Sequence, residues 1–323
     1  MTDGLIIETD GLTREFTRRG KGRDALHRHT LRAVDELRLT VRPGESVGYI
    51  GANGAGKSTT IKMLVGILVP TSGTVRTCGI DPHKERKRLA AQVGVVFGQR
   101  SQLWWDLPVR ESFEILAAIH RLPGADARAR TNELIEQLEL QEFLATPVRQ
   151  LSLGQRMRAE VAAALLHRPR LVILDEPTIG LDVLSKQRLR EFLITERREH
   201  GTTLLLTTHD MGDIERLCER VLVVDHGRAV YDGSLDGLAR RAGAERTLVL
   251  DFADATPDLT GIPHTTHLGS EVAGARQRLA FDSEMTTAAA VLVAVGEHAQ
   301  LRDLSIEEPD IEDVVRRIYH ASR

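Results

Sequence analysis

Residues 51–58 combine three glycines, a lysine and a hydroxyl in a pattern that suits phosphate binding. They read Gly-Ala-Asn-Gly-Ala-Gly-Lys-Ser and fit G-x-x-x-x-G-K-[ST] at every position. Glycines let backbone N–H groups approach phosphate oxygens, and the helix expected to follow offers more N–H groups at its positive end. Lys57 adds a charge at the outer phosphates, and the Ser58 hydroxyl is a hard ligand suited to Mg²⁺. The motif predicts magnesium–ATP bound by Gly51, Ala52, Asn53, Gly54, Ala55, Gly56, Lys57, Ser58 and Thr59.

Two adjacent carboxylates supply a second chemical element. Asp175 and Glu176 follow the apolar run at residues 171–174, which predicts a buried strand that carries both side chains to the edge of a sheet. We expect Asp175 to hold Mg²⁺ through a water molecule, and Glu176 to orient or deprotonate the attacking water. Combined with a complete phosphate-binding loop, the pair predicts that ATP is hydrolysed as well as bound.

Residues 151–155, Leu-Ser-Leu-Gly-Gln, resemble the signature of ATP-binding cassette ATPases, whose common form is Leu-Ser-Gly-Gly-Gln. Leu153 stands in place of the first glycine. The resemblance, taken with the loop and the carboxylates, covers about residues 5–235. It implies that Ser152, Gly154 and Gln155 of one cassette close over ATP held by the loop of a second cassette. We therefore expect a dimer of cassettes, as a homodimer or with a related chain.

Four further residues stand where the family has functional ones. Gln99 resembles the Q-loop glutamine, which contacts magnesium and the attacking water, although Gly98 precedes it and leaves Gln102 as the alternative. Asp182 resembles the D-loop aspartate, and His209 resembles the switch histidine, which helps to hold the γ-phosphate and the water. Phe16 stands where a tyrosine usually stacks on adenine.

These motifs need a scaffold in which strands alternate with helices. We expect strands at residues 4–8, 37–41, 46–50, 73–77, 93–97, 171–174, 203–207, 221–224 and 229–231. Helices are expected at residues 57–68, 183–200 and 211–220, and a helical subdomain is expected at about 100–167. The predicted fold class is α/β: a P-loop NTPase cassette with a mixed or parallel sheet core, an antiparallel β subdomain and a helical subdomain.

A change of character near residue 244 predicts a second domain. From Glu245 to the end the formal charge is −7, whereas the whole chain of 323 residues carries −3. Weak strand alternation at residues 247–252 and 279–281, followed by helices near 285–298 and 311–318, predicts a small α+β domain. The expected division is 1–243 for the nucleotide-binding domain and 244–323 for the accessory domain.

Composition limits the class of protein. Neither the small net charge nor any motif predicts a nucleic-acid partner. The two cysteines, Cys78 and Cys218, are far apart and fit a reducing cytoplasm without disulfides. The N-terminus lacks a secretory signal pattern, and no apolar run approaches the roughly 18–20 residues that cross a bilayer. We expect a peripheral protein on the cytoplasmic face of the cell membrane.

Two features point to a membrane partner. Trp104 and Trp105 lie just beyond Gln99, where transporter cassettes form the groove for a permease helix, and large aromatic anchors suit such a groove; ordinary packing within the helical subdomain is the alternative. The tail at residues 307–314 resembles the cassettes of ABC-2 type exporters, the multidrug or daunorubicin-like group. This resemblance implies a separate multi-span permease. The competing functions are a soluble ABC ATPase without a transporter and an importer ATPase with a regulatory tail.

Overall fold

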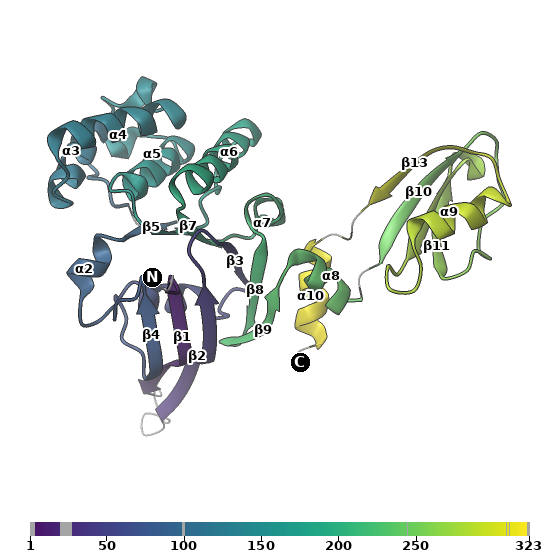
Figure 1. Ribbon diagram of the computed structural model, residues 1–323, viewed down its shortest axis with the longest axis horizontal. Helices are drawn as coiled ribbons and strands as arrows, with labels where there is room; N and C mark the ends of the chain where they lie inside the picture. Colours follow the sequence, from purple (N-terminus) through teal and green to yellow (C-terminus); the bar gives the residue numbers. More distant parts are fainter. Residues whose placement is uncertain are drawn as a thin grey trace. The chain divides into compact units, whose positions relative to one another are not determined.

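The structure is a computed structural model that describes residues 4–19, 28–98, 101–243, 245–307, 309 and 311–321. The chain divides into two compact units, Met1–Ser234 and Leu235–Arg323 (Figure 1). The sequence predicted a boundary at 243/244. In the structure the helix α8 (Leu235–Arg241) belongs to the second unit, where it packs against α10 (Ile311–Ala321).

A six-stranded sheet with the order β5-β6-β7-β3-β8-β9 forms the centre of the first unit. The pairs within β5-β6-β7-β3-β8 are parallel, and the edge strand β9 is antiparallel to β8. Strands β3 and β7 are buried at every position, which explains their continuous apolar sequences. The strands are β3 (Ser46–Gly51), β5 (Val93–Phe97), β6 (Leu171–Asp175), β7 (Thr203–Thr207), β8 (Arg220–Asp225) and β9 (Arg228–Gly233).

A separate antiparallel sheet with the order β2-β1-β4 lies on one side of the central sheet (Figure 1). It consists of β1 (Ile7–Arg19), β2 (Arg28–Val41) and β4 (Ser72–Thr77). The predicted strands at 4–8 and 37–41 were too short. Pairing continues to Arg19 opposite Arg28, because threonines in both arms, together with Phe16 in β1, favour extended backbone although arginines interrupt the apolar pattern.

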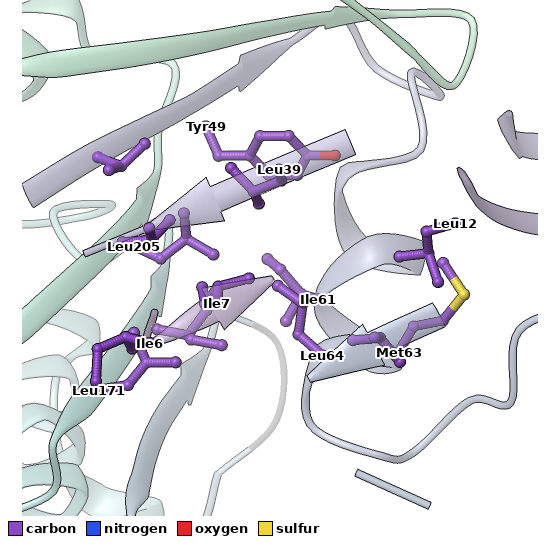
Figure 2. Packing of buried hydrophobic residues seen from close by; sticks show 14 of the residues in the cluster. Ile6, Ile7, Leu12, Leu39, Tyr49, Ile61, Met63, Leu64, Leu171 and Leu205 are labelled. Atoms are coloured by element: carbon purple, nitrogen blue, oxygen red, sulfur yellow. The ribbon is translucent and has the colours of Figure 1, made fainter. Parts of the chain in front are cut away.

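Helix α1 (Lys57–Leu64) lies between the two sheets and packs on both of them. Its side chains Ile61 and Leu64 share one buried cluster with Ile7 of β1, Leu39 of β2 and Leu205 of β7 (Figure 2). The helix ends earlier than the predicted residue 68. Gly66 adopts φ +74°, and a Cβ there would lie 2.2 Å from the carbonyl oxygen of Pro82, so the chain turns away at a position that only glycine fits.

Most helices of the first unit lie on the other side of the central sheet (Figure 1). The predicted helical subdomain contains α3, α4 and α5, together with short 3₁₀ turns at Gln141–Phe143 and Val148–Gln150. Helix α7 ends at Leu217, before the predicted residue 220, because β8 begins at Arg220. The bounds are α2 (Arg86–Ala90), α3 (Val109–Ile119), α4 (Gly124–Gln137), α5 (Leu153–Leu165), α6 (Val183–His200) and α7 (Met211–Leu217).

The second unit contains an antiparallel sheet with the order β11-β12-β10-β13. Alternate residues of β10, namely Leu248, Leu250 and Phe252, form a buried cluster with Val291 and Val295 of α9. The edge strands β11 and β13 were not predicted, because their side chains are mostly exposed or half-buried and show little apolar alternation. The elements are β10 (Arg246–Phe252), β11 (Thr265–Glu271), a 3₁₀ turn (Val272–Gly274), β12 (Arg276–Phe281), α9 (Ala288–Gly296) and β13 (Leu301–Glu307).

Across the described part of the chain, none of the helices has the length and apolar character needed to cross a lipid bilayer.

A buried ion pair joins the helical subdomain to the core. The guanidinium Nη2 of Arg130 on α4 lies 2.6 Å from Oε1 of Glu196 on α6, and both side chains are almost fully buried. Glu133 also accepts from Arg130, at 2.8 Å. A buried charge that loses its partner is costly, because neither solvent nor another group compensates for it.

We predict that Glu196→Gln lowers the free energy of unfolding by about 3 kcal/mol, since it leaves much of the Arg130 charge unpaired. The two tryptophans, Trp104 and Trp105, lie in the helical subdomain, so their fluorescence in a urea titration reports on this unit. The exposed pair Arg38–Asp10 supplies the control, because Asp10→Asn should cost less than about 1 kcal/mol. Equal losses in both variants would contradict the assignment.

Candidate active site

The strand order brings the predicted chemical groups to one edge of the central sheet. Strands β6, β7 and β3 are neighbours and run parallel, so their carboxyl ends meet at the same edge. Strand β6 ends in Asp175, β7 ends two residues before His209, and β3 ends at Gly51, where the phosphate-binding loop begins. Three motifs that are far apart in the sequence therefore converge.

The phosphate-binding loop has a conformation that only glycine accommodates at two positions. Gly54 has φ +85° and Gly56 has φ +102°. A Cβ on Gly56 would lie 2.2 Å from the carbonyl oxygen of Ala33 on β2, so the loop presses against the antiparallel sheet. No side chain caps the start of α1, and the first N–H groups of the helix are left for an anion.

Lys57 is largely buried beneath this loop. Its ammonium Nζ donates to the carbonyl oxygens of Gly51 and, at 3.2 Å, of Ala52. Burial lowers the pKa of Lys57, and the negative charges of Glu176 and Asp175 oppose that shift. The lysine is thus held by carbonyl oxygens of its own loop, near enough to the two carboxylates for their charges to act on it.

Ser58 and Thr59 occupy the first turn of α1, with Ser58 exposed and Thr59 half-buried. The next residue, Thr60, is buried and was not singled out from the sequence. Its hydroxyl accepts a hydrogen bond from the Tyr49 hydroxyl at 3.0 Å and donates to the Gly56 carbonyl oxygen at 3.2 Å. These bonds fix the start of α1 to strand β3. The apolar context of Tyr49 gives no signal of this role.

The two carboxylates occupy different environments. Asp175 accepts a hydrogen bond from the Thr207 hydroxyl at 2.5 Å, which fixes one of its oxygens to the neighbouring strand. Glu176 has φ +58°, a conformation that is uncommon outside glycine, and its N–H donates to the Thr207 carbonyl oxygen at 2.9 Å. Thr207 therefore holds both acidic residues, a role that its place in an apolar strand did not reveal.

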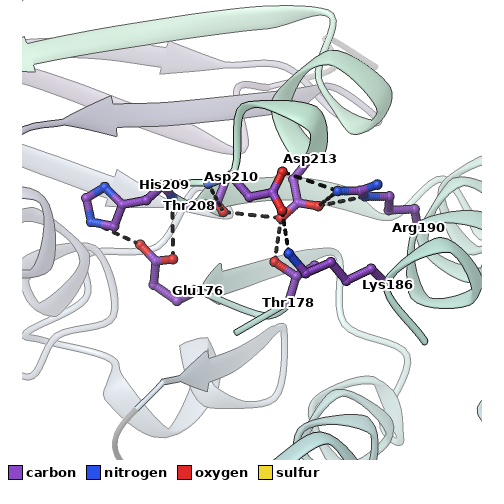
Figure 3. Close-up of polar contacts among 8 residues, drawn as sticks. All are labelled: Glu176, Thr178, Lys186, Arg190, Thr208, His209, Asp210 and Asp213. Carbon is purple, nitrogen blue, oxygen red and sulfur yellow. Dashed lines mark hydrogen bonds and ion pairs between the residues drawn. The ribbon is translucent and has the colours of Figure 1, made fainter. Parts of the chain in front are cut away.

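Glu176 and His209 face each other across this edge (Figure 3). The His209 ring nitrogen Nε2 lies 3.4 Å from Glu176 Oε1, and the His209 backbone N–H donates to Glu176 Oε2 at 3.4 Å. Burial raises the pKa of Glu176, and the neighbouring His209 opposes the rise. A carboxylate with a raised pKa, next to an exposed imidazole, suits the handling of a water proton near neutral pH.

The remaining predicted contacts have different outcomes. Gln99 lies outside the described residues. The alternative, Gln102, donates its side-chain amide to the carbonyl oxygen of Glu160 on α5 at 3.0 Å, so this amide forms part of the scaffold. Phe16 lies on β1 with the Arg14 guanidinium carbon 4.8 Å from its ring centroid, which leaves the aromatic face engaged by a cation.

The signature residues form the start of α5. Ser152 is the N-cap: its hydroxyl accepts from the Gln155 N–H at 3.2 Å, and the Gln155 side chain accepts from the Ser152 N–H at 3.0 Å. Leu153 lies against Gly180, where an added Cβ would be 2.3 Å from Leu153 Cδ2. Gly154 similarly faces Leu181. The bulk of Leu153 is therefore directed partly onto the Gly180 segment of its own chain.

Asp182 begins α6 as its N-cap. Its carboxylate accepts from the Ser185 N–H at 2.9 Å and from the Ser185 hydroxyl at 2.8 Å, and the backbone hydrogen bond from Ser185 lowers the pKa of Asp182. Within the described residues, no hydrogen bond or ion pair joins loop residues 51–59 to signature residues 152–155. Direct polar contacts therefore do not hold the two motifs together within the described part of the chain.

Comparison with known proteins places these features in context. A family described as ABC transporter matches residues 34–179. The chain is 32% identical over 208 residues to the ABC transporter ATP-binding protein NatA of Bacillus subtilis, covering 64% of this chain and 84% of that protein. It is 41% identical over 206 residues to the Nod factor export ATP-binding protein I of Ralstonia nicotianae, covering 62% of each. The linearmycin resistance ATP-binding protein LnrL of Bacillus subtilis is 30% identical over 285 residues, 86% of this chain and 91% of that protein.

Solved structures agree with the sequence relatives. An ATP-binding subunit of an ABC transporter superposes with a TM-score of 0.64 at 27% identity, covering 74% of this chain and 93% of that chain. A dimeric ATP-binding cassette in a post-hydrolysis state, bound to ADP and Pi, superposes with a TM-score of 0.63 at 26% identity, covering 71% of this chain and 98% of that chain.

We predict that Glu176→Gln keeps ATP binding but lowers the turnover number at least about 100-fold, because the amide cannot accept a proton from water. Nucleotide titration and phosphate release measure the two effects separately. Lys57→Ala supplies the contrast, since it removes a charge at the phosphates and should weaken nucleotide affinity instead. Near-normal turnover in Glu176→Gln would refute its assignment.

Proposed function

This chain belongs to the family of ABC transporter ATP-binding proteins, and we propose that it is the ATPase subunit of an ABC-2 type exporter, powering a separate membrane permease. ATP binding and hydrolysis are the activities of the family. The observation that carries the exporter proposal is the match to LnrL. Its 285 aligned residues exceed the 234 residues of the first unit, so the similarity extends into the second unit. The names of LnrL and of the Nod factor export protein favour an exporter over a soluble ATPase or an importer.

We infer that the phosphate-binding loop, from Gly51 to Thr59, holds the phosphates of ATP. Lys57 neutralises charge at the outer phosphates, and the uncapped start of α1 supplies N–H donors. Magnesium arrives with the nucleotide. The oxygen donors available here, the Ser58 hydroxyl and the Asp175 carboxylate, fit a hard cation that keeps several waters and phosphate oxygens as ligands. Gln99 is proposed as a further ligand, and Phe16 as the surface for adenine.

Hydrolysis is proposed to depend on Glu176 and His209. A water molecule attacks the γ-phosphorus, the bond to the bridging oxygen of ADP breaks, and the water proton passes to the Glu176 carboxylate. His209 lies 3.4 Å from that carboxylate and its side chain is exposed, so we propose that it helps to hold the γ-phosphate and the attacking water. Gln99 is proposed to orient the water.

A second cassette is proposed to complete the site. Ser152, Gly154 and Gln155 stand at the exposed start of α5, where N–H groups and the helix dipole favour an anion. Asp182 lies near this surface, because Leu153 at the start of α5 contacts Gly180, which precedes Asp182 by two residues. Closure of two copies would bring the signature of one over the ATP of the other, and a homodimer is the simplest arrangement. Hydrolysis then reopens the pair.

The permease is proposed to contact the helical subdomain. Trp104 and Trp105 are both exposed, with Trp105 more than half accessible, and Arg156 stacks near the Trp105 ring at 5.8 Å from its centroid. Exposed tryptophans next to a basic residue are characteristic of contact sites for another protein. Docking on a permease would hold the chain at the cytoplasmic face of the membrane.

The proposed function predicts ATP-dependent export by a complex of this chain with a multi-span permease. Export from cells that express the native chain and the permease should be lost with Glu176→Gln, while the complex still assembles. Copurification of the two proteins and efflux of a fluorescent drug measure assembly and transport. Turnover of ATP without any copurifying membrane protein in the native host would argue against the exporter role.

We predict that Trp104→Ala or Trp105→Ala uncouples ATP hydrolysis from transport, with basal turnover changed less than about threefold, because the aromatic anchors are exposed and belong neither to the phosphate-binding loop nor to the segments of Glu176 and His209. Transport and basal ATPase activity, measured on the same preparation, show whether transport is lost while hydrolysis is kept. Retained coupling in both variants would contradict the docking proposal. Loss of folding would instead assign the two tryptophans to packing of the helical subdomain.

A further inference from the structure

A fully buried carboxylate lies behind the candidate active site. Asp213, in the first turn of α7, accepts hydrogen bonds from three separate segments (Figure 3). The donors are the Thr178 hydroxyl at 2.5 Å, the Thr208 hydroxyl at 3.2 Å and Nε of Arg190 on α6 at 2.6 Å. No motif in the sequence singles out these residues.

The charges around Asp213 are balanced. Asp210 accepts from Lys186 Nζ at 2.6 Å and from Arg190 Nη2 at 3.4 Å, so two carboxylates face two cations. A buried carboxylate is expensive unless its hydrogen bonds and counter-charges are complete, and here both conditions are met. A network of this kind is rigid, because Arg190 binds both carboxylates and each threonine hydroxyl donates to Asp213.

The network joins the two segments that carry the proposed catalytic groups. Thr178 follows Glu176 by two residues, and Thr208 immediately precedes His209. Between Glu176 and Asp182 the backbone is linked by turns, with the Ile179 N–H donating to the Glu176 carbonyl oxygen at 3.3 Å. The bonds of Asp213 therefore fix the Glu176 segment relative to the His209 segment. Glu176, with φ +58°, needs such support, because an uncommon backbone conformation persists only where its surroundings impose it.

We propose that Asp213 is a positioning residue for ATP hydrolysis, which sets the separation of Glu176 and His209 through the hydroxyls of Thr178 and Thr208. Asp213 touches neither catalytic group, so it acts only through the two threonines and Arg190. The same hydrogen bonds connect the Asp182 segment to His209. A displacement of the Asp182 segment by a second cassette is therefore transmitted to the switch histidine. The inference rests on the ATPase activity and is independent of the exporter role.

The first test is Asp213→Asn in the full chain. The amide keeps one acceptor oxygen but presents an NH₂ group to Arg190 or to a threonine hydroxyl. We expect the turnover number to fall about 10- to 100-fold, which is the loss of rate expected when reacting groups are slightly misplaced. The KM for ATP should change much less, because the phosphate-binding loop is untouched. Thr178→Val should show the same split, and Thr178→Ser, which restores the hydroxyl, should recover most of the turnover.

Turnover per molecule that binds nucleotide is the readout that loss of stability does not move. Nucleotide titration counts the folded molecules in each preparation. A fall in turnover per bound nucleotide therefore reports the placement of Glu176 and His209 and not unfolding.

Glu196→Gln is the matched control. It also replaces a buried carboxylate paired with an arginine, and α6 carries both Glu196 and Arg190. It should lower the melting temperature but leave turnover per bound nucleotide unchanged at temperatures well below unfolding. Native turnover in folded Asp213→Asn would overturn the proposal, as would equal losses of turnover in the control. An inactive native chain would instead count against the ATPase function itself.

Discussion

Parallel pairing of β6, β7 and β3 is the constraint on which the rest of the structure depends. Because the three strands run in the same direction and are neighbours, the residues that follow them emerge at one edge. Asp175, His209 and Gly51 come from separate parts of the chain, and only this order places them together. Parallel neighbours are joined by crossover connections, and the helices in these connections cover the faces of the sheet. This accounts for the burial of β3 and β7 and for the position of α6 over the sheet.

A second constraint operates at the phosphate-binding loop. The glycine at position 56 lies so close to β2 that the antiparallel sheet and the loop must move together. Helix α1 has apolar contacts with both sheets, so the start of the helix cannot tilt without disturbing the buried cluster that they share. Backbone N–H groups can stay available for an anion in such a place because the helix is stabilised by its buried face and needs no side-chain cap.

The sequence predicted the cassette fold, because each motif adjoins residues whose local pattern also predicts the strand or helix that carries it. Residues 183–200 and 203–207 were placed correctly, because α6 has clear caps and β7 is continuously apolar. The length of β1 and β2 was missed because arginines interrupt their apolar pattern. Thr207, Thr60 and Asp213 were missed for a different reason. Their importance arises from hydrogen bonds between different segments, with partners 32, 11 and 35 residues apart in the sequence, and such pairings leave no periodic signal. The two edge strands of the second unit's sheet, β11 and β13, likewise gave no signal in the sequence, because their mostly exposed or half-buried side chains show little apolar alternation.

The capping box at Ser152 has a consequence for how an anion would be received there. The hydroxyl oxygen of Ser152 accepts from the Gln155 N–H, which holds the oxygen in place and leaves its own hydrogen able to donate. A phosphate that approached the start of α5 would meet a side chain already held in one position, and little side-chain entropy would be lost on contact. The bonds that begin the helix would thus also prepare the proposed contact, and these bonds form within one chain.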